Sequence, residues 1–407
     1  MKPKLLLVLF MLMTCLLAER STAQTRYADS IFAGYTLDSV TYSVYGYKMN
    51  IYQPAGDVQA TRPLVVLAHG GSFYTGDRYS DNTVTQLCAD LAHKGYVTVS
   101  IDYTLIAHPG NFLNGDSAAT EVLRAVGDGK AAVRYFYKDA SSTNTYRIDT
   151  NNVFIGGNSA GAVLFMQYAY VDSAAQLSPA LQQDLNNNAG GFQGNSGNPG
   201  YSTNFKAVIN LAGGLNDPNY ITRCSKPVVS AQGDSDKVVP YTCADPTVSG
   251  FPVPLQLCGL GSLLPFIRDN TPYHTEIVFP GDGHVPWATD LSKFYRVDTL
   301  ITSFLYTELN NTAPTICPNP PAGIHDIAAA TISLYPNPAS NVLNIRSSQM
   351  ISNIYMVDIM GHTIAQVSDV NNVDYQLNTS KLSTGVYFIR IYNGQNQIPV
   401  VRKVTIE

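Results

Sequence analysis

Apolar residues gather in short continuous runs that alternate with stretches of helical periodicity. Six short runs are rich in apolar residues, and they lie at 63–68, 96–101, 153–155, 207–212, 227–231 and 275–279. Such runs are typical of strands that are buried on both faces of a sheet. Helical patterns at 81–93, 116–138 and 290–309 lie between or after them. The alternation predicts an α/β fold, with a mostly parallel sheet covered by helices on both faces.

A different pattern precedes this region. Residues 27–53 alternate apolar and polar positions, as in Val40–Tyr45 and Tyr47–Tyr52. Alternation with a period of two predicts strands with one buried face, here an antiparallel hairpin. The segment 186–204 is rich in Asn and Gly, and we expect either a disordered linker or an insertion over the active site.

The pattern changes again near the C-terminus. Residues 313–329 are rich in proline and are predicted to be an inter-domain linker. From 330 to 407 the chain carries only short alternating strands and no catalytic constellation, which predicts a small all-β sandwich. The catalytic region is therefore expected at 24–312.

The N-terminus has the features of a secretory signal over residues 1–23. Lys2 and Lys4 precede an apolar core at Leu5–Leu17, and a small-residue cleavage site ends at Ala23. That core is shorter than the roughly 20 residues that a membrane-spanning helix needs. We therefore expect export and no transmembrane segment in the mature protein. The net charge of −5 also argues against a nucleic-acid partner.

Export permits disulfide bonds. Without Cys15, which falls in the signal, five cysteines remain. Cys88 lies in a helical pattern and is predicted to be a buried free thiol. The other four allow three pairings, of which we favour Cys243 with Cys258 and Cys224 with Cys317.

The strongest chemical signal follows the run Val153–Ile155. The chain passes through Gly157-Asn158-Ser159-Ala160-Gly161 into a helix-compatible stretch rich in Ala, Leu, Phe and Met. A strand, a sharp turn and a helix around G-x-S-x-G form a nucleophile elbow. Its flanking positions must be small because strand and helix nearly touch there. Ser159 is therefore the candidate nucleophile.

A serine hydroxyl needs a general base and an orienting carboxylate. His284 lies on a Gly-rich loop after the last predicted strand, where the catalytic groups of open α/β sheets gather. The rival His274 starts that strand and so belongs at the opposite edge. Asp236 and Asp234 compete for the carboxylate, with Asp217 as a third candidate. The order Ser159, Asp236, His284 is the one expected for α/β-hydrolases.

Donors for an oxyanion are predicted after the run at 63–68, in His69-Gly70-Gly71-Ser72-Phe73. Consecutive glycines let backbone N–H groups turn toward a substrate oxygen. We expect the oxyanion hole at Gly71, Ser72 and Ala160, with Gly70 as a further candidate. This chemistry calls for no cofactor and no metal ion.

These residues resemble the α/β-hydrolase superfamily, over roughly residues 35–309. The motifs His69–Phe73 and Gly157–Gly161 look like those of its HGG(G)-[FW] and G-[DHN]-SAG esterase branch. That branch includes carboxylesterases of the hormone-sensitive-lipase type and secreted acetyl-xylan or feruloyl esterases. Ser72 replaces a third glycine, and Asn158 stands where Asp or His is common, which leaves the subfamily and its substrate open.

Residues 331–407 resemble the C-terminal sorting domain of cargo for the type IX secretion system. The matching motifs are Leu334–Ala339, Gly385–Arg390 and the terminal Lys403–Glu407. The resemblance implies that the type IX machinery is a partner, and that the protein passes through the periplasm to the cell surface or the medium. A carbohydrate-binding module is the alternative, but the only tryptophan, Trp287, lies in the catalytic region.

Together these features predict a secreted serine carboxylesterase. Its substrate would be a small-molecule or polymer-borne ester, either an acetyl or feruloyl group on a polysaccharide or a short-chain acyl ester. A serine peptidase of the same fold and a non-catalytic surface binding protein are the alternatives. We expect the segments 186–204 and 241–266 to line the substrate pocket.

Overall fold

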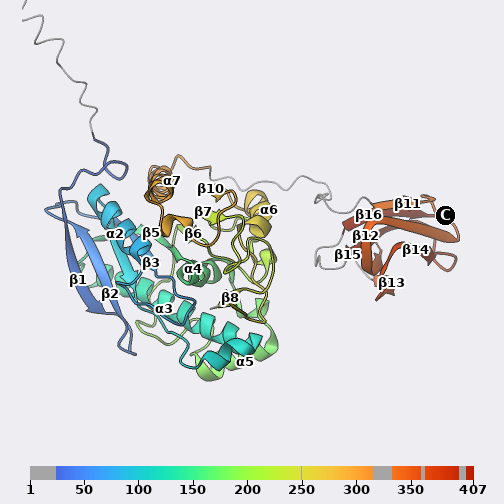
Figure 1. Ribbon diagram of the computed structural model, residues 1–407, viewed down its shortest axis with the longest axis horizontal. Helices are drawn as coiled ribbons and strands as arrows, with labels where there is room; N and C mark the ends of the chain where they lie inside the picture. Colours follow the sequence, from blue (N-terminus) through green and yellow to red (C-terminus); the bar gives the residue numbers. More distant parts are fainter. Residues whose placement is uncertain (1–23, 249, 315–331, 359–362, 394–399) are drawn as a thin grey trace, which may run out of the picture. The chain divides into compact units, whose positions relative to one another are not determined.

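A computed structural model of the chain describes residues 24–248, 250–314, 332–358, 363–393 and 400–407 (Figure 1). The predicted signal at 1–23 and nearly all of the predicted linker lie outside these residues. The chain divides into two compact units, Met1–Pro318 and Asn319–Glu407. Each unit is described separately below.

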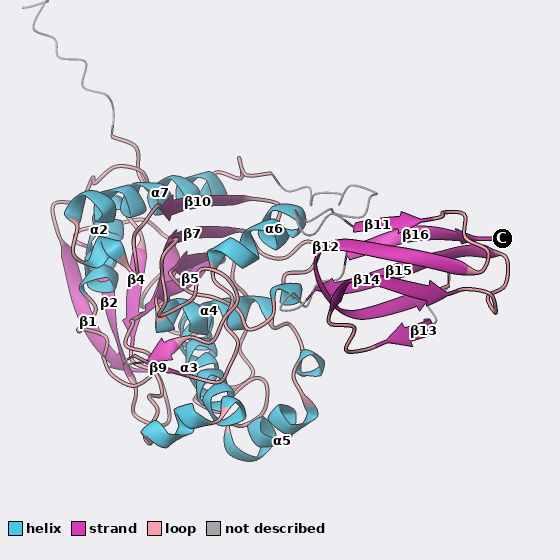
Figure 2. Ribbon diagram, turned by 45° about the vertical axis from the view of Figure 1, so that its right-hand side comes forward, coloured by secondary structure: helices cyan, strands magenta, loops and turns pink. Residues whose placement is uncertain are grey.

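The larger unit is built on an eight-stranded sheet with the order β1-β2-β4-β3-β5-β6-β7-β10 (Figure 2). Its strands are β1 (Tyr35–Thr41), β2 (Lys48–Pro54), β3 (Arg62–Ala68), β4 (Val97–Ile101), β5 (Ile148–Asn158), β6 (Ala207–Leu211), β7 (Val228–Gly233) and β10 (His274–Phe279). The pairs β1–β2 and β2–β4 are antiparallel, and the others are parallel. The predicted hairpin and parallel sheet are both confirmed, although the hairpin's first strand begins earlier than its pattern indicated. The single buried face expected of these two strands is not seen, because β1 is almost wholly exposed and β2 almost wholly buried.

Helices cover both faces of this sheet. They are α2 (Asn82–Lys94), α3 (Gly115–Ser141), α4 (Ala160–Tyr170), α5 (Pro179–Asn188), α6 (Leu260–Asn270) and α7 (Leu291–Leu309). Val65 and Leu67 of β3 pack in the cluster that contains α2 and α7, whereas Leu64 and Val66 face α3 and α4. Because both faces of β3 are covered, every position of that strand is buried, and apolar residues fill all of them except the first, Arg62.

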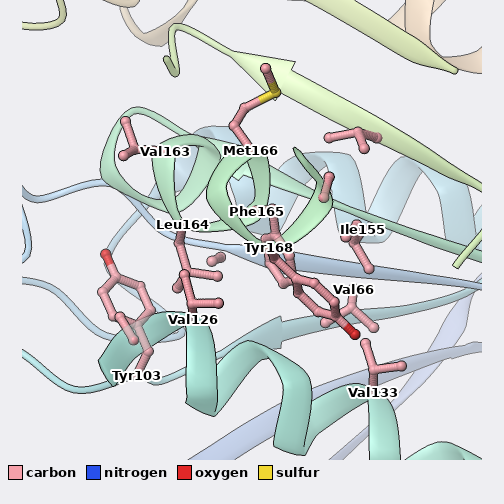
Figure 3. Close-up of a cluster of buried hydrophobic side chains, with 14 of the residues drawn as sticks. Val66, Tyr103, Val126, Val133, Ile155, Val163, Leu164, Phe165, Met166 and Tyr168 are labelled. Carbon is pink, nitrogen blue, oxygen red and sulfur yellow. The ribbon is translucent and has the colours of Figure 1, made fainter. Parts of the chain in front are cut away.

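Helix α4 lies at the centre of one face. Every residue in it is buried, which agrees with its nearly uniform apolar sequence. Figure 3 shows Leu164 and Phe165 of α4 between the sheet residues Val66 and Ile155 and the side chains of α3. The helix that starts at the candidate nucleophile is therefore fixed by packing along its whole length.

The segment 186–204 corrects our expectation for it. It is neither a disordered linker nor an insertion over the active site, because it packs along α3. Lys130 Nζ donates to the Phe192 carbonyl at 2.7 Å, and Arg134 donates to the Gln193 and Gly197 carbonyls at 3.0 Å each. The Ser196 hydroxyl donates to the buried Asp128 carboxylate.

The smaller unit contains β11 (Ile332–Tyr335), β12 (Val342–Val357), β13 (Thr363–Val367), β14 (Asn372–Asn378), β15 (Gly385–Asn393) and β16 (Val400–Ile406). All strand pairs are antiparallel, as expected of an all-β domain. β12 is a single strand of 16 residues, although only short strands are expected in this region. Its first half pairs with β11 and β14, and its second half with β13 and β15. β12 therefore pairs with four other strands, and the six strands form one nearly barrel-like sheet rather than two separate sheets.

One predicted disulfide is present, between Cys243 and Cys258. It closes the loop that carries the short hairpin β8 (Thr247–Val248) and β9 (Phe251–Pro252). Cys88 is a buried free thiol, as predicted, and burial raises its pKa to about 12. The pairing of Cys224 with Cys317 stays a prediction, because Cys317 lies outside the described residues.

The buried Lys130 makes a prediction about stability. Burial, with a smaller contribution from Arg134, lowers its pKa from 10.5 to about 8. Between these two pH values the unfolded chain binds a proton that the folded chain does not, so stability increases as the pH rises through this window. We expect wild type to gain up to about 3 kcal/mol relative to Lys130→Met from pH 8 to 10.5.

Urea unfolding across that pH range measures the difference between the two proteins. Lys138→Met removes an exposed lysine from the same helix and should follow wild type. Parallel pH profiles for wild type and Lys130→Met would contradict the effect of burial on Lys130.

Candidate active site

The turn between β5 and α4 places Ser159 at the end of a central strand. Ser159 has φ 53° and ψ −118°, a strained conformation that is typical of a nucleophile elbow. A Cβ atom on Gly157 would lie 2.5 Å from the Ala68 carbonyl oxygen, and one on Gly161 would meet the same oxygen. Glycine is required at both positions because the end of β3 passes directly against the turn.

Ser159 belongs to a chain of short hydrogen bonds. Its hydroxyl lies 2.7 Å from His284 Nε2, and His284 Nδ1 lies 2.7 Å from Asp236 Oδ2. The Asp236 side chain is fully buried, whereas that of His284 is 17% exposed. The buried carboxylate can only accept, so His284 carries its proton on Nδ1 and leaves Nε2 to accept from the serine hydroxyl. The structure therefore brings together the three residues predicted from sequence.

The surroundings of Asp236 hold it in one orientation. Its Oδ1 accepts from the backbone N–H groups of Val238 and Val239 at 2.9 and 3.1 Å. Its Oδ2 also accepts from the Gln232 side chain at 3.2 Å. With the His284 contact, four donors point at the two oxygens, so the carboxylate is fixed relative to the imidazole.

The rival residues lie elsewhere. Asp234 accepts from the Gly281 N–H at 2.7 Å and so holds the loop that carries His284. Asp217 caps a short 3₁₀ helix at Pro218–Tyr220. His274 begins β10, at the opposite end of that strand from His284, and faces Glu276. None of the three contacts Ser159 or His284.

The loop after β3 brings backbone donors beside Ser159. Gly71, Ser72 and Phe73 all have positive φ, of 122°, 55° and 56°. In the described part of the chain, the N–H groups of Gly71, Ser72 and Ala160 have no acceptor. The N–H of Gly70 is already bound to Asp81 at 2.8 Å, so the fourth candidate is unavailable to a substrate.

The buried side chain of His69 stabilises this loop. Its Nδ1–H donates to the Gly70 carbonyl at 2.6 Å, and its ring stacks on Tyr103 at 4.3 Å. The Tyr103 hydroxyl donates to the His69 carbonyl at 2.8 Å. Burial lowers the pKa of His69, which favours the neutral ring. His69 thus has a structural place under the loop, apart from the serine.

The sequence interpretation missed a network that joins the three loops. Asp81 accepts from the Gly70 N–H and, at 3.0 Å, from the Asn158 amide, while its other oxygen caps α2. Trp287 Nε1 donates to Asn158 Oδ1 at 3.1 Å. The asparagine at 158 therefore fits its neighbours, because it donates to a carboxylate and accepts from an indole. Its departure from the usual Asp or His was the available signal.

An apolar cavity of about 850 Å³, including its open mouth, lies beside Ser159, Ser72 and Ala160. Helices α3 and α4 contribute Val122 and Val163, and none of the described lining residues is charged. The segment 241–266 lines the cavity from Pro246 to Leu257, as predicted. The segment 186–204 lines none of it, so that part of the prediction is wrong.

Comparisons with known families divide the chain in the same way. Residues 49–217 match the BD-FAE family model, an α/β-hydrolase esterase domain, and residues 333–407 match the secretion system C-terminal sorting domain. The sorting domain indicates export by type IX secretion, to the cell surface or into the medium.

Among solved structures, the chain is similar to esterase 2 of Thermogutta terrifontis. In the form phosphorylated by paraoxon, the TM-score is 0.47 and the identity 18%, over 73% of this chain and 100% of that chain. The propionate-bound form gives a TM-score of 0.47 and 16% identity, over 71% and 98%. A comparison with curated proteins finds no match.

Two further searches concern the described residues alone. No helix among them is both long and apolar enough to cross a membrane. Within the same ranges, no group of three or more His, Cys, Asp or Glu residues could hold a metal ion.

The hydrogen bonds of Asn158 with Asp81 and Trp287 lead to a testable prediction. Asn158→Asp places a second carboxylate against Asp81 and removes the donor between them, so both stability and loop positions should change. We expect a loss of about 1–3 kcal/mol in unfolding free energy and a fall in esterase kcat/KM of roughly tenfold.

Urea unfolding and ester hydrolysis measure these two losses. Asn151→Asp, at an exposed position on the same strand, should leave both unchanged. The double variant Asn158→Asp/Asp81→Asn restores a donor to the pair and should recover part of the activity. If the double variant loses more than either single variant, repulsion between the carboxylates is not the cause.

Proposed function

We propose that this protein is an exported serine carboxylesterase. Ser159 acts as the nucleophile, His284 as the general acid and base, and Asp236 as the residue that orients the imidazole. The observation that carries the proposal is the chain of two 2.7 Å hydrogen bonds from Ser159 through His284 to Asp236, beside an apolar cavity. The BD-FAE match supports ester hydrolysis as the reaction class.

In the first half of the reaction, His284 Nε2 takes the Ser159 proton as Oγ attacks the ester carbonyl carbon. The carbonyl oxygen becomes an oxyanion and accepts from the free N–H groups of Gly71, Ser72 and Ala160. Each such donor contributes about 3–4 kcal/mol of transition-state stabilisation. The imidazolium, held by Asp236, then protonates the leaving alkoxide, and the alcohol departs from the acyl-enzyme.

In the second half, a water molecule occupies the place of the alcohol. His284 accepts a proton from that water while the water oxygen attacks the acyl carbonyl carbon. The second oxyanion accepts hydrogen bonds from the same three N–H groups, and its collapse releases Ser159 Oγ, which takes the proton from His284. The products are a carboxylic acid and an alcohol.

An ester suits this site better than a peptide does. A peptidase that trims chain ends needs a charged or strongly polar site for the terminus, but no described residue lining the cavity is charged. A non-catalytic binding role would leave the strained Ser159 backbone and the buried Asp236 without a use.

Ser159→Ala tests the nucleophile. We expect hydrolysis of p-nitrophenyl esters to fall by about 10³-fold or more, because the acyl-enzyme cannot form. The variant should keep its thermal unfolding midpoint, since alanine also fits the turn. A fluorophosphonate probe should label wild type and leave Ser159→Ala unlabelled. Full activity in the variant would refute the assignment.

The two neighbouring aspartates give a paired test. Asp236→Asn should lower kcat by about 10⁴-fold, because an amide donor beside Nδ1 favours the wrong imidazole tautomer. Asp234→Asn changes the contacts to the Gly281 N–H and to the Ser235 hydroxyl, and it should cost roughly tenfold or less. Steady-state kinetics on one ester compares them, and a larger loss at Asp234 would reverse the assignment.

A further inference from the structure

A second hollow adjoins the cavity beside Ser159. Phe112, Val248 and Val253 line both this inner cavity and the outer hollow. The inner cavity reaches Ser159, and the outer hollow lies among exposed side chains. The two hollows are therefore neighbours, and a path through both of them would join Ser159 to the surface.

The outer hollow is bordered by large apolar side chains that are unusually exposed. Leu113, Phe251 and Tyr74 are 79%, 75% and 44% exposed, and we call these three residues the outer patch. They come from three separate segments, namely the 3₁₀ helix Pro109–Leu113, the hairpin β8–β9 and the loop after β3. Exposed apolar side chains that gather in one place, rather than scatter, mark a binding surface.

The polar groups of the path are few, and the Thr247 hydroxyl already donates to the Lys237 carbonyl at 3.0 Å. Gln167 lines the inner cavity and donates from Nε2 to Asn216 Oδ1 at 3.0 Å. No described lining residue of either hollow is charged. A sugar would need hydrogen-bond partners for its hydroxyl groups, and burying them here without partners would be costly. An acetyl group, in turn, would leave most of the inner cavity empty.

We propose that the natural substrates are esters of unbranched aliphatic acids longer than butyrate. This inference rests on the proposed esterase function of Ser159. The carboxyl carbon lies at Ser159 and the alkyl chain runs past Val163 and Val122 through the inner cavity. The far end of a longer chain emerges between Phe112 and Val253 and contacts the outer patch.

A series of p-nitrophenyl esters from acetate to dodecanoate tests this on the full chain. We expect kcat/KM to rise roughly three- to fourfold with each methylene from acetate to octanoate, as each one leaves water for an apolar wall. Preference for acetate would overturn the inference while leaving the esterase function in place. No hydrolysis of any ester by the folded protein would overturn both.

Ala119→Phe fills the inner cavity from α3 and tests the path itself. It should lower kcat/KM for octanoate by about tenfold more than for acetate. An equal effect on both esters would place the chain elsewhere. A parallel series of ethyl to octyl acetates tests the direction, because a steep rise there would assign the path to the alcohol and overturn the acyl assignment.

The outer patch has its own matched test. Phe251→Ser and Leu113→Ser should lower kcat/KM for dodecanoate several-fold relative to butyrate. Val58→Ser removes a side chain that is 90% exposed and lines neither hollow, so it should change neither value. If the Phe251 and Leu113 variants behave like Val58→Ser, the outer patch has no part in binding the chain.

Discussion

The active site depends on one close approach of backbone to backbone. The end of β3 at Ala68 runs against the turn at Gly157 and Gly161 with no side chain between them. This contact sets the distance between the loop that carries Gly71 and Ser72 and the helix that begins at Ala160. Ser159 and the candidate oxyanion donors therefore share one rigid support, and α4 secures it because every residue of that helix is buried.

The other two members of the hydrogen-bonded chain come from distant parts of the sequence. Ser159 and His284 are 125 residues apart, and His284 and Asp236 are 48 apart. The parallel pairing of β5, β6, β7 and β10 brings their carboxyl ends to one edge, and each loop then has only a short way to go. The Asp81–Asn158–Trp287 network ties together the segments that follow β3, β5 and β10, so a shift in one of them is resisted by the others.

The sequence predicted the parts of the site that follow from local pattern. Buried strands, the elbow and the Gly-rich loops each have a short signature, and the α/β architecture fixes their order along one edge. Local pattern could not place the segment 186–204, because its position depends on Lys130 and Arg134 of α3 reaching its carbonyl groups. Local pattern also could not predict the length of β12, because its two halves pair with different strands. For the same reason the sequence analysis did not single out Asp81, which caps α2 and also binds the Gly70 N–H and the Asn158 amide.

The Cys243–Cys258 disulfide constrains one part of the larger unit, whereas the candidate catalytic residues lie outside the loop that it closes. The loop it closes carries Val248 and Val253 of the apolar path, whereas Ser159, Asp236 and His284 all lie outside that loop. A disulfide that closes a loop of this length stabilises the fold by about 3 kcal/mol, because it lowers the conformational entropy of the unfolded chain. Ser159, Asp236 and His284 are thus held by packing and hydrogen bonds alone, while one wall of the apolar cavity is also tightened by a bond that only an oxidising compartment supplies. The shape of the cavity therefore depends on the redox state of the surroundings, whereas the Ser159–His284–Asp236 chain does not depend on it directly.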